Sequence, residues 1–446
     1  MKLIIFTPAS EKSAIGRMAA LLSHSLMEKG CEVGIVRTEA PHLLDTSTHE
    51  FGAPIISWRN DIEVRRLISR SDACIYQVGN NFDYHGGGLY WLDKHPGLVC
   101  LHDFFLGHLF HEWAQTYRHQ ADTILEKWYG DGAAKRFFEF ANHETFIDRA
   151  YESMPLTEWV CSKANGVITH SQWGCNRVMS SCPGPIRVVP LAYDSPNSGV
   201  SVVENRSTSE DSLRLLTIGH VNPNKRIPSV MQAISQSDLL REKVTYHLVG
   251  AIQSSTKEHL QQLAASLNVN LTVAGEVDAS TLEQAINSSD VISCLRWPAL
   301  EAASASAIEA MLYGKPVIVT ATGFYNEIPD DCSIKIDQED EIDQIQTALE
   351  SLLEDRKRLR KIGTAGQEWA SNTFTASNYS SQILAITEDM QKTNPAQISA
   401  KRISNTLAGW SASESIRGNS ALIDPLAIFE HLYPNASLPQ PESSGN

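Results

Sequence analysis

The sequence predicts an α/β protein with two Rossmann-like, doubly wound domains that face a common cleft, followed by C-terminal helices. The chain has 446 residues, which exceeds what one hydrophobic core usually supports. In each half, short apolar runs alternate with longer segments of helical period. Such alternation is typical of a parallel sheet with helices on both faces, and here it occurs twice.

The first domain is expected over residues 1–195. Short apolar runs predict its buried strands at 3–6, 33–36, 73–78, 98–101 and 167–169. Between about 104 and 162 the pattern stays helical and is rich in aromatic residues and alanine. We therefore expect a helical excursion at this point of the domain.

The second domain is expected over residues 212–390. A stretch rich in Ser, Asn, Asp and Glu, 194–212, is the predicted linker before it. Apolar runs predict the strands of this domain at 213–218, 244–249, 271–274, 291–294 and 316–319. Residues 391–446 are expected to form a helical extension with a flexible tail, because Gly, Ser and Pro interrupt them.

The composition narrows the range of functions. A formal charge of −15 argues against a protein that wraps nucleic acid, since such binding needs clustered Lys and Arg facing phosphates. The eight cysteines are scattered without any C-x-x-C spacing, so we interpret them as reduced core thiols. No His or Cys set has the spacing of metal ligands, and we expect no metal site.

The compartment is inferred from the ends and the hydropathy of the chain. The N-terminus leads directly into a strand pattern, unlike a signal peptide. No run of about 18 apolar residues occurs, so no membrane span is expected. We expect a cytoplasmic protein, and the sequence leaves open a peripheral contact with the inner face of the membrane.

The segment 291–316 carries the most informative chemistry. It reads as strand, loop, helix, turn and strand, with Glu301 in the loop and Glu309 in the first turns of the helix. Ligands of such sheets bind beyond the carboxyl ends of the strands, and free N–H groups at a helix start suit a diphosphate. Two other interpretations stay open: Glu301 as a solvated loop carboxylate, and a capping box in which Ser306 caps the helix and Glu309 reaches back.

A second phosphate-binding pattern opens the second domain. The strand predicted at 213–218 is followed by Gly219 and His220, and then by the basic pair Lys225 and Arg226. A fixed cation beside a departing diphosphate stabilises the negative charge that develops there, as a metal ion does, and Lys225 is our candidate. The alternative is an exposed basic pair near a helix start, which the helix dipole disfavours.

The two glutamates also carry a family resemblance. Glu301 and Glu309 are separated by seven residues and followed by Ala310, Met311 and the run Gly-Lys-Pro-Val at 314–317. This pattern resembles the hallmark of glycosyltransferase family 4, retaining enzymes of the GT-B fold among the glycosyl transferases group 1. The resemblance implies that Glu301 holds hydroxyls of the transferred sugar and that Glu309 binds the ribose diol.

The same resemblance implies a complete donor site, in which backbone amides at the start of the helix hold phosphate oxygens. Its expected residues, besides Glu301, are Gly16, Gly219, His220, Lys225, Arg226, Ser304, Ala305, Ser306 and Glu309. The chain departs from the family at Ser304, where glycine is usual, at Ser306, where proline is frequent, and at His220, where arginine often stands. Phosphate contacts here are therefore expected to include a hydroxyl.

Two runs of the first domain, which end at His85 and Asp103, are similar to a bacterial subgroup of the same family. The resemblance implies that His102 lies near the transferred sugar, and that Asn80, His85 and Asp103 shape the acceptor or sugar pocket. A histidine at a strand end is otherwise more often a hydrogen-bonded structural residue.

The loop after the first strand contains Gly16 and resembles the glycine loop of the family, which faces the donor diphosphate and the acceptor. The alternative is a strand-to-helix turn that needs close backbone approach. His102, Lys225 and Glu301 are the resulting catalytic candidates.

The predicted activity is retaining transfer of a sugar from a UDP- or GDP-linked donor, without a metal or other cofactor. The expected acceptor is a glycan or glycoconjugate of bacterial surface polysaccharide synthesis. Two alternatives stay open: a nucleotide-sugar-binding subunit without catalysis, and a GT-B sugar-nucleotide epimerase. The second needs an acid and a base carboxylate from the first domain facing the sugar carbon, and the sequence has no such matched pair.

Overall fold

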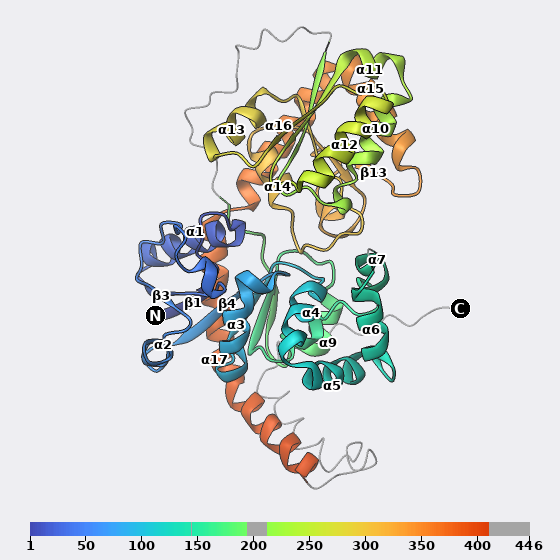
Figure 1. Cartoon of the computed structure of the whole chain (residues 1–446). Helices are drawn as coiled ribbons and strands as arrows, with labels where there is room; N and C mark the ends of the chain where they lie inside the picture. The colour runs from blue at the N-terminus through green and yellow to red at the C-terminus, as the bar shows by residue number, and fades with distance from the viewer. Residues whose placement is uncertain (144, 194–211, 410–446) are drawn as a thin grey trace, which may run out of the picture.

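A seven-stranded parallel sheet forms the N-terminal domain in a computed structural model that describes residues 1–143, 145–193 and 212–409 (Figure 1). The strand order is β3-β2-β1-β4-β5-β6-β7, whose first six strands follow the order of a dinucleotide-binding sheet. The strands are β1 (Lys2–Thr7), β2 (Glu32–Arg37), β3 (Ile55–Ser57), β4 (Ala73–Val78), β5 (Leu98–Leu101), β6 (Gly166–Thr169) and β7 (Ile186–Val188).

Both faces of this sheet are covered, which explains the uninterrupted apolar runs in its strands. In β1, Leu3 and Ile5 point into one core, and Ile4 and Phe6 point into the other. The helices around the sheet are α1 (Ala14–Glu28), α2 (Asp61–Ile68), α3 (Phe82–Lys94), α4 (Gly107–Thr116), α5 (Arg118–Tyr129), α6 (Ala133–Ala141), α7 (Phe146–Ala150), α8 (Thr157–Cys161) and α9 (Cys175–Ser181), with a 3₁₀ turn η1 (Pro41–Leu43). Helices α4 to α8 occupy the segment where the helical excursion was expected.

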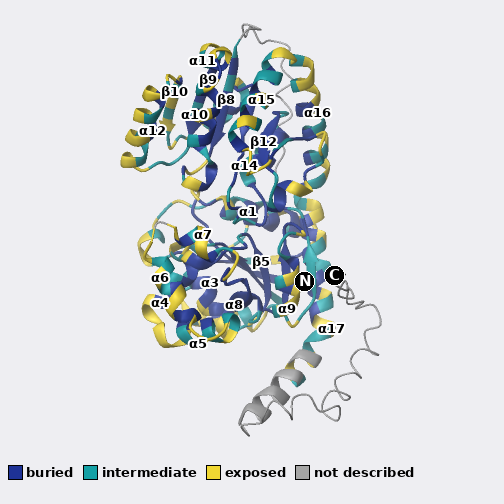
Figure 2. Ribbon diagram, turned by 90° about the vertical axis from the view of Figure 1, so that its right-hand side faces the viewer, coloured by how far each residue is buried: buried dark blue, intermediate teal, exposed yellow. Residues whose placement is uncertain are grey.

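A six-stranded parallel sheet with the order β10-β9-β8-β11-β12-β13 forms the C-terminal domain. Its strands are β8 (Leu213–Ile218), β9 (Val244–Val249), β10 (Leu271–Gly275), β11 (Val291–Ser293), β12 (Val317–Thr320) and β13 (Ile334–Ile336). Its helices are α10 (Ile227–Ser235), α11 (Asp238–Lys243), α12 (Ser254–Ser266), α13 (Ala279–Ser288), α14 (Ala305–Leu312), α15 (Glu341–Glu354) and α16 (Arg356–Thr373), with the 3₁₀ turns η2 (Pro223–Lys225) and η3 (Gly323–Glu327). The prediction of two doubly wound, Rossmann-like domains is confirmed, and Figure 2 shows the central strands of the sheets as largely buried.

Three edge strands, β3, β7 and β13, were not predicted. Each has only three residues, and most of their side chains are half-buried. Because an edge strand is only partly covered, its sequence lacks the continuous apolar run that marks the central strands.

The last helix, α17 (Ala376–Gly409), returns to the N-terminal domain (Figure 1). Its residues Tyr379 and Ile383 are fully buried in the core that contains α1, and Ser380 Oγ lies 2.8 Å from Ser25 Oγ. Arg187 of β7 donates to Asp389 over 2.7 Å. The expected boundary at 390 assigned this segment to the C-terminal domain, whereas its buried face packs on the other domain.

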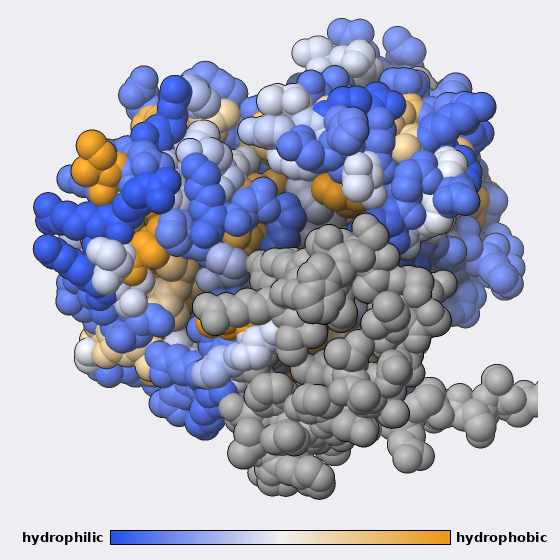
Figure 3. Space-filling view, turned by 90° about the horizontal axis from the view of Figure 1, so that it is seen from below, coloured by the Kyte–Doolittle hydropathy of each residue, from blue (hydrophilic) through white to orange (hydrophobic). Residues whose placement is uncertain are grey.

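The expected linker, 194–212, lies outside the described residues except for Ser212, and so does the expected tail from residue 410 onward. Over the part of the chain that the structure describes, no helix is long and apolar enough to cross a membrane. The face drawn in Figure 3 is mostly hydrophilic, with scattered apolar side chains.

Candidate active site

The predicted site residues lie at the carboxyl ends of strands next to the point where strand order reverses in each sheet. In the N-terminal sheet this point falls between β1 and β4, and in the C-terminal sheet it falls between β8 and β11. Ligands of open α/β sheets bind in the crevice at such points. Gly16 follows β1, Asn80 follows β4, Gly219 follows β8 and Glu301 follows β11.

Backbone contacts join the two domains directly beside Glu301. Asp103 and Glu301 form an isolated antiparallel bridge, and the amide of Ala302 donates to the carbonyl of His102 over 2.8 Å. The structure therefore brings His102, Asp103 and Glu301 together, as the sequence predicted, although they are about 200 positions apart in the chain.

Glu301 is oriented by two side chains of its own domain. Its Oε1 accepts hydrogen bonds from Arg296 Nε at 3.0 Å and from the Tyr325 hydroxyl at 2.9 Å. Burial acts against the charge of Arg296, but the neighbouring Tyr325 and Glu301 raise the pKa of its guanidinium above the usual value. The carboxylate of Glu301 is therefore fixed in position by two hydrogen bonds, and its interpretation as a solvated loop residue is wrong.

Sequence reasoning missed both partners of Glu301. Arg296 could have been recognised in the sequence, because it is a charged residue among the apolar residues that follow β11. Buried arginines are rare unless they are paired. Tyr325 lies in η3, reached only after another strand, and nothing in its local sequence marks it as a partner.

Helix α14 is capped by Ser304. Its Oγ accepts the Ala307 amide at 3.4 Å, while Ser306 Oγ lies 3.2 Å from both Ser304 Oγ and the guanidinium of Arg296. The proposed capping box of Ser306 and Glu309 is wrong, since α14 begins at Ala305, two residues too early for Ser306 to be its cap. Both serine hydroxyls face the helix start, where the sequence departs from the family.

Glu309 instead faces the N-terminal domain. Its Oε1 lies 3.3 Å from Arg17 of α1 and its Oε2 lies 3.2 Å from the hydroxyl of Tyr193. The Arg17 guanidinium also stands 5.0 Å from the centre of the Tyr193 ring. The second glutamate of the motif is thus joined to the opposite domain through both of its oxygens.

Lys225 is buried at the end of β8, in the turn η2 and two residues before α10 begins. Its Nζ donates to the carbonyl of Ile218, and a Cβ on Gly219 would stand 3.0 Å from that amine. Burial, and then the charge of Arg296, hold the pKa of the Lys225 amine well below its usual value. The alternative of an exposed basic residue is therefore wrong for Lys225.

The other two basic candidates lie elsewhere. Arg226 has its Nε 3.0 Å from both carboxylate oxygens of Glu341, the buried first residue of α15. The structure thus uses Arg226 to hold α10 against α15, which differs from the expected donor contact. His220 is exposed on the loop after β8.

Asn80 has a structural function that the sequence did not predict. Its side-chain oxygen accepts the amides of His108 and Leu109, each at 3.0 Å, and so satisfies the free N–H groups at the start of α4. The backbone amide of Asn80 donates to Asp103 Oδ2 over 2.7 Å. The capping contact uses the side-chain oxygen of Asn80, and the expected role of this residue in an acceptor pocket stays a prediction.

Three buried histidines lie behind the interdomain contact. His102 Nε2 is 2.6 Å from Gln77 Oε1, His85 Nδ1 is 3.0 Å from the Gln77 carbonyl, and the rings of His102 and His170 are 4.7 Å apart. Burial lowers the pKa of His85 and of His170 to about 4. Burial, and then the charges of His170 and His85, hold the pKa of His102 well below its usual value. All three imidazoles are neutral at pH 7, so His102 is a hydrogen-bonding group and not a cation.

Asp103 titrates near neutrality. Burial raises the pKa of its carboxyl to about 7, the Asn80 amide opposes that shift, and the charge of Glu301 adds to it. The protonation state of Asp103 therefore changes within the physiological pH range.

Gly16 lies in the first turn of α1, where its amide donates to Ser13 over 3.0 Å. A Cβ at this position would stand 2.7 Å from the Pro8 carbonyl oxygen. Close packing of the helix start on the preceding loop therefore requires glycine, which supports the turn interpretation.

The fold and its comparisons define the class of protein. The model for the family "Glycosyl transferases group 1" matches residues 203–369, which cover most of the C-terminal domain. Residues 203–369 therefore resemble a group 1 glycosyl transferase domain, and the two domains together have the GT-B fold. Within the described residues, no group of three or more His, Cys, Asp or Glu side chains is placed to hold a metal ion.

Individual relatives are distant. An MMP alpha-(1->4)-mannosyltransferase from Mycolicibacterium hassiacum is 22% identical over 277 residues, which span 60% of this chain and 62% of that protein. The sucrose-phosphate synthase structure from Thermosynechococcus elongatus has a TM-score of 0.58 at 15% identity and covers 90% of this chain and 100% of its own. The structure of HepE from Anabaena in complex with UDP has a TM-score of 0.56 at 16% identity, covering 89% and 100%.

Proposed function

We propose that this protein is a retaining glycosyltransferase that moves a sugar from a nucleotide-sugar donor to a saccharide or glycoconjugate acceptor. One observation carries the proposal: Glu301, held by buried Arg296, and Glu309 flank the start of α14 inside a group 1 domain. Two carboxylates and two buried cations at one switch point match a polar sugar, a ribose and a diphosphate.

The donor is a nucleoside diphosphate sugar. Free amides at the start of α14, from Ser304, Ala305 and Ser306, point at the diphosphate, and the helix dipole favours its charge. Glu309 binds the ribose diol and Glu301 binds hydroxyls of the sugar. UDP is the first nucleotide to test, because the related HepE structures hold UDP and UDP-glucose, with GDP as the second.

The chemistry needs no enzymic nucleophile. The acceptor hydroxyl attacks the anomeric carbon on the face that the diphosphate leaves, and the departing diphosphate takes the proton of that hydroxyl. Lys225 and Arg296 stabilise the charge on the leaving group without a metal ion. An anion beside Lys225 favours the charged amine, so donor binding counters the low pKa produced by burial.

The acceptor and the location are part of the proposal. We place the enzyme in the cytoplasm, at the inner face of the membrane when its acceptor is lipid-linked, in the synthesis of bacterial surface polysaccharide. The similarity to WaaG, a glycosyltransferase of lipopolysaccharide biosynthesis, supports this acceptor class (TM-score 0.54, 13% identity).

Transfer assays test the proposal with Glu301→Gln and Lys225→Ala. With UDP- or GDP-hexoses and a saccharide mixture, the wild-type chain is expected to release nucleoside diphosphate and to form a product with the donor's anomeric configuration. Loss of one preorganised charge contact is expected to lower kcat about 10²–10³-fold. Folded variants with near wild-type transfer would contradict the proposed roles, and loss of activity in EDTA would contradict metal independence.

A binding subunit without catalysis is the second candidate. It is favoured by the contacts of Glu309 with Arg17 and of Lys225 with the Ile218 carbonyl, which engage groups that a donor needs. Nucleotide-sugar binding without release of nucleoside diphosphate, under any acceptor mixture, would select this candidate. Interconversion of donor epimers would instead select the epimerase.

A further inference from the structure

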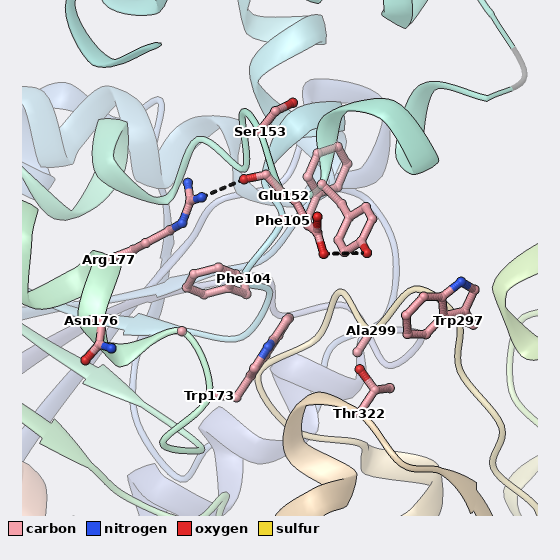
Figure 4. Close-up of a pocket in the computed structure, with 12 residues that line it drawn as sticks. Phe104, Phe105, Glu152, Ser153, Trp173, Asn176, Arg177, Trp297, Ala299 and Thr322 are labelled. Atoms are coloured by element: carbon pink, nitrogen blue, oxygen red, sulfur yellow. Dashed lines mark hydrogen bonds between the residues drawn. The ribbon is translucent and has the colours of Figure 1, made fainter. Parts of the chain in front are cut away.

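A cavity of about 680 Å³ lies between the domains, next to the proposed sugar site (Figure 4). Phe104, which follows Asp103 directly, lines it from the N-terminal domain, and Ala299, two residues before Glu301, lines it from the C-terminal domain. Ligand pockets commonly have volumes of about 300–1,000 Å³. The cavity is therefore large enough for a small ligand and begins where the two site loops meet.

Aromatic side chains line the cavity from both domains. Phe104 and Trp173 pack with their ring centres 4.8 Å apart, and Trp297 joins them from the other domain (Figure 4). Both tryptophans are only half-buried, so part of each indole faces the cavity. Aromatic faces carry a negative quadrupole and attract the C–H bonds on the apolar face of a pyranose ring.

Polar groups lie at the rim on the N-terminal side. Glu152 Oε1 accepts the Tyr151 hydroxyl at 2.8 Å, and Arg177 donates to the Glu152 carbonyl over 2.6 Å. Arg177 is neutralised by the buried Glu158, 3.2 Å away, whereas the Glu152 carboxylate has no cationic partner in the described part of the chain. The lining thus presents hydrogen-bonding groups and one uncompensated negative charge.

We propose that this cavity binds an uncharged sugar ring of the acceptor. The inference rests on the proposed glycosyl transfer, whose acceptor it specifies. A pyranose ring needs both an apolar wall and a hydroxyl-binding rim, and the cavity offers both. A phosphorylated or carboxylated ring would be repelled by Glu152, and an alkyl chain would leave the rim groups without partners.

The location differs from the one that the sequence indicated for the acceptor. Asn80 caps α4 through its side-chain oxygen and His85 is buried against Gln77, and neither residue lines the cavity. The loops that carry Phe104 and Ala299 are shared with the Asp103–Glu301 bridge, so a ring in the cavity lies near the carboxylate that holds the transferred sugar.

Saturation-transfer NMR on the full chain with saturating UDP tests the proposal. The probes are methyl α-glucoside, methyl α-mannoside and maltotriose as neutral sugars, glucose 1-phosphate as an anionic one and 1-octanol as an alkyl chain. We expect at least one neutral sugar to bind and Trp297→Ala to raise its Kd about tenfold or more, since one aromatic wall is lost. Trp128→Ala, a half-buried tryptophan of α5 outside the lining, is the matched control and should leave the Kd unchanged.

Charge is tested separately with Glu152→Gln, which keeps an acceptor oxygen for Tyr151. This variant should retain the neutral sugar and gain binding of glucose 1-phosphate.

The proposal is overturned if only 1-octanol or glucose 1-phosphate binds the wild type, if no probe binds at millimolar concentration, or if Trp297→Ala and Trp128→Ala behave alike. Neutral-sugar binding that responds to Trp297 in a chain without transferase activity would support the cavity and reject the enzymic function. Normal transfer with an unchanged acceptor KM in Trp297→Ala would support the enzymic function and reject the cavity as the acceptor site.

Discussion

Tyr325 is a buried phenol whose hydroxyl donates to Glu301 over 2.9 Å. Tyr325→Phe removes the hydroxyl while Arg296 continues to hold the same carboxylate. A hydrogen bond to a charged group contributes about 1.5–3 kcal/mol, so kcat/KM is expected to fall roughly ten- to hundredfold.

Steady-state kinetics with the best donor measure this effect. Tyr246→Phe is the matched control, because that buried phenol bonds to Thr217 within the sheet, away from Glu301. Equal losses in the two variants would show a general effect of removing a buried hydroxyl, and would contradict a specific role for Tyr325.

Asp103 gives a pH-dependent contribution to stability. Its folded-state pKa of about 7 lies above the usual value of 3.8 for an aspartate, so the native state binds the proton more tightly than the unfolded chain does. The contribution is therefore fully present below about pH 4 and is lost as the pH rises through 7. Asp103→Asn, which keeps an oxygen for the Asn80 amide, should flatten the stability profile over this range.

Thermal denaturation across pH 4–8 checks this expectation. Glu301→Gln should move the midpoint of the slope to lower pH, because the charge of Glu301 helps to raise the pKa of Asp103. An unchanged profile in both variants would mean that Asp103 is ionised throughout the range.

Helix α14 depends on Ser304 for its start. Ser304→Ala should reduce the free energy of unfolding by about 0.5–2 kcal/mol, since a capping side chain is lost. Ser306→Ala should cost less, because Ser306 is inside the helix and only contacts Ser304 and Arg296. Guanidinium denaturation of both variants measures the difference, and the opposite order would restore Ser306 as the cap.

At the level of elements, the local sequence pattern predicted the central strands and the β11–α14 unit. Continuous apolar runs mark the strands, and the spacing of Glu301 and Glu309 falls within one short segment of the chain. The local pattern could not predict β3, β7 or β13, because these three-residue edge strands are mostly half-buried and lack a continuous apolar run. Contacts between residues far apart in the chain leave no local pattern either. This explains why Asn80, which caps a helix that begins 27 positions later, and Arg226, whose partner Glu341 lies on another helix, were not predicted in these contacts.

On the scale of the whole molecule, Arg17 competes with the proposed nucleotide for Glu309. The ion pair joins the two domains at 3.3 Å, with the side chain of Arg17 39% exposed and that of Glu309 14% exposed. A partly exposed pair contributes about 0.2–1 kcal/mol. Arg17→Ala is therefore expected to tighten UDP binding by about 1.4- to fivefold, since the ribose no longer displaces it.

Isothermal titration calorimetry with UDP tests this competition. Arg65→Ala is the control, because Arg65 is an exposed arginine paired with Asp61 four residues away on α2. Weaker UDP binding in Arg17→Ala would mean that Arg17 contacts the nucleotide itself.

The return of α17 to the N-terminal domain has a mechanical consequence. The chain leaves that domain after Tyr193 and re-enters it at Thr375, and these two residues form a parallel bridge, so both crossings lie side by side. Because the C-terminal domain is covalently linked to the N-terminal domain at two adjacent points, rotation of one domain against the other is restricted to a hinge at this place. Tyr193 also donates to Glu309, the carboxylate proposed to bind the ribose, so this carboxylate lies at the pivot. Binding of the ribose to Glu309 therefore acts directly on the hinge between the two domains.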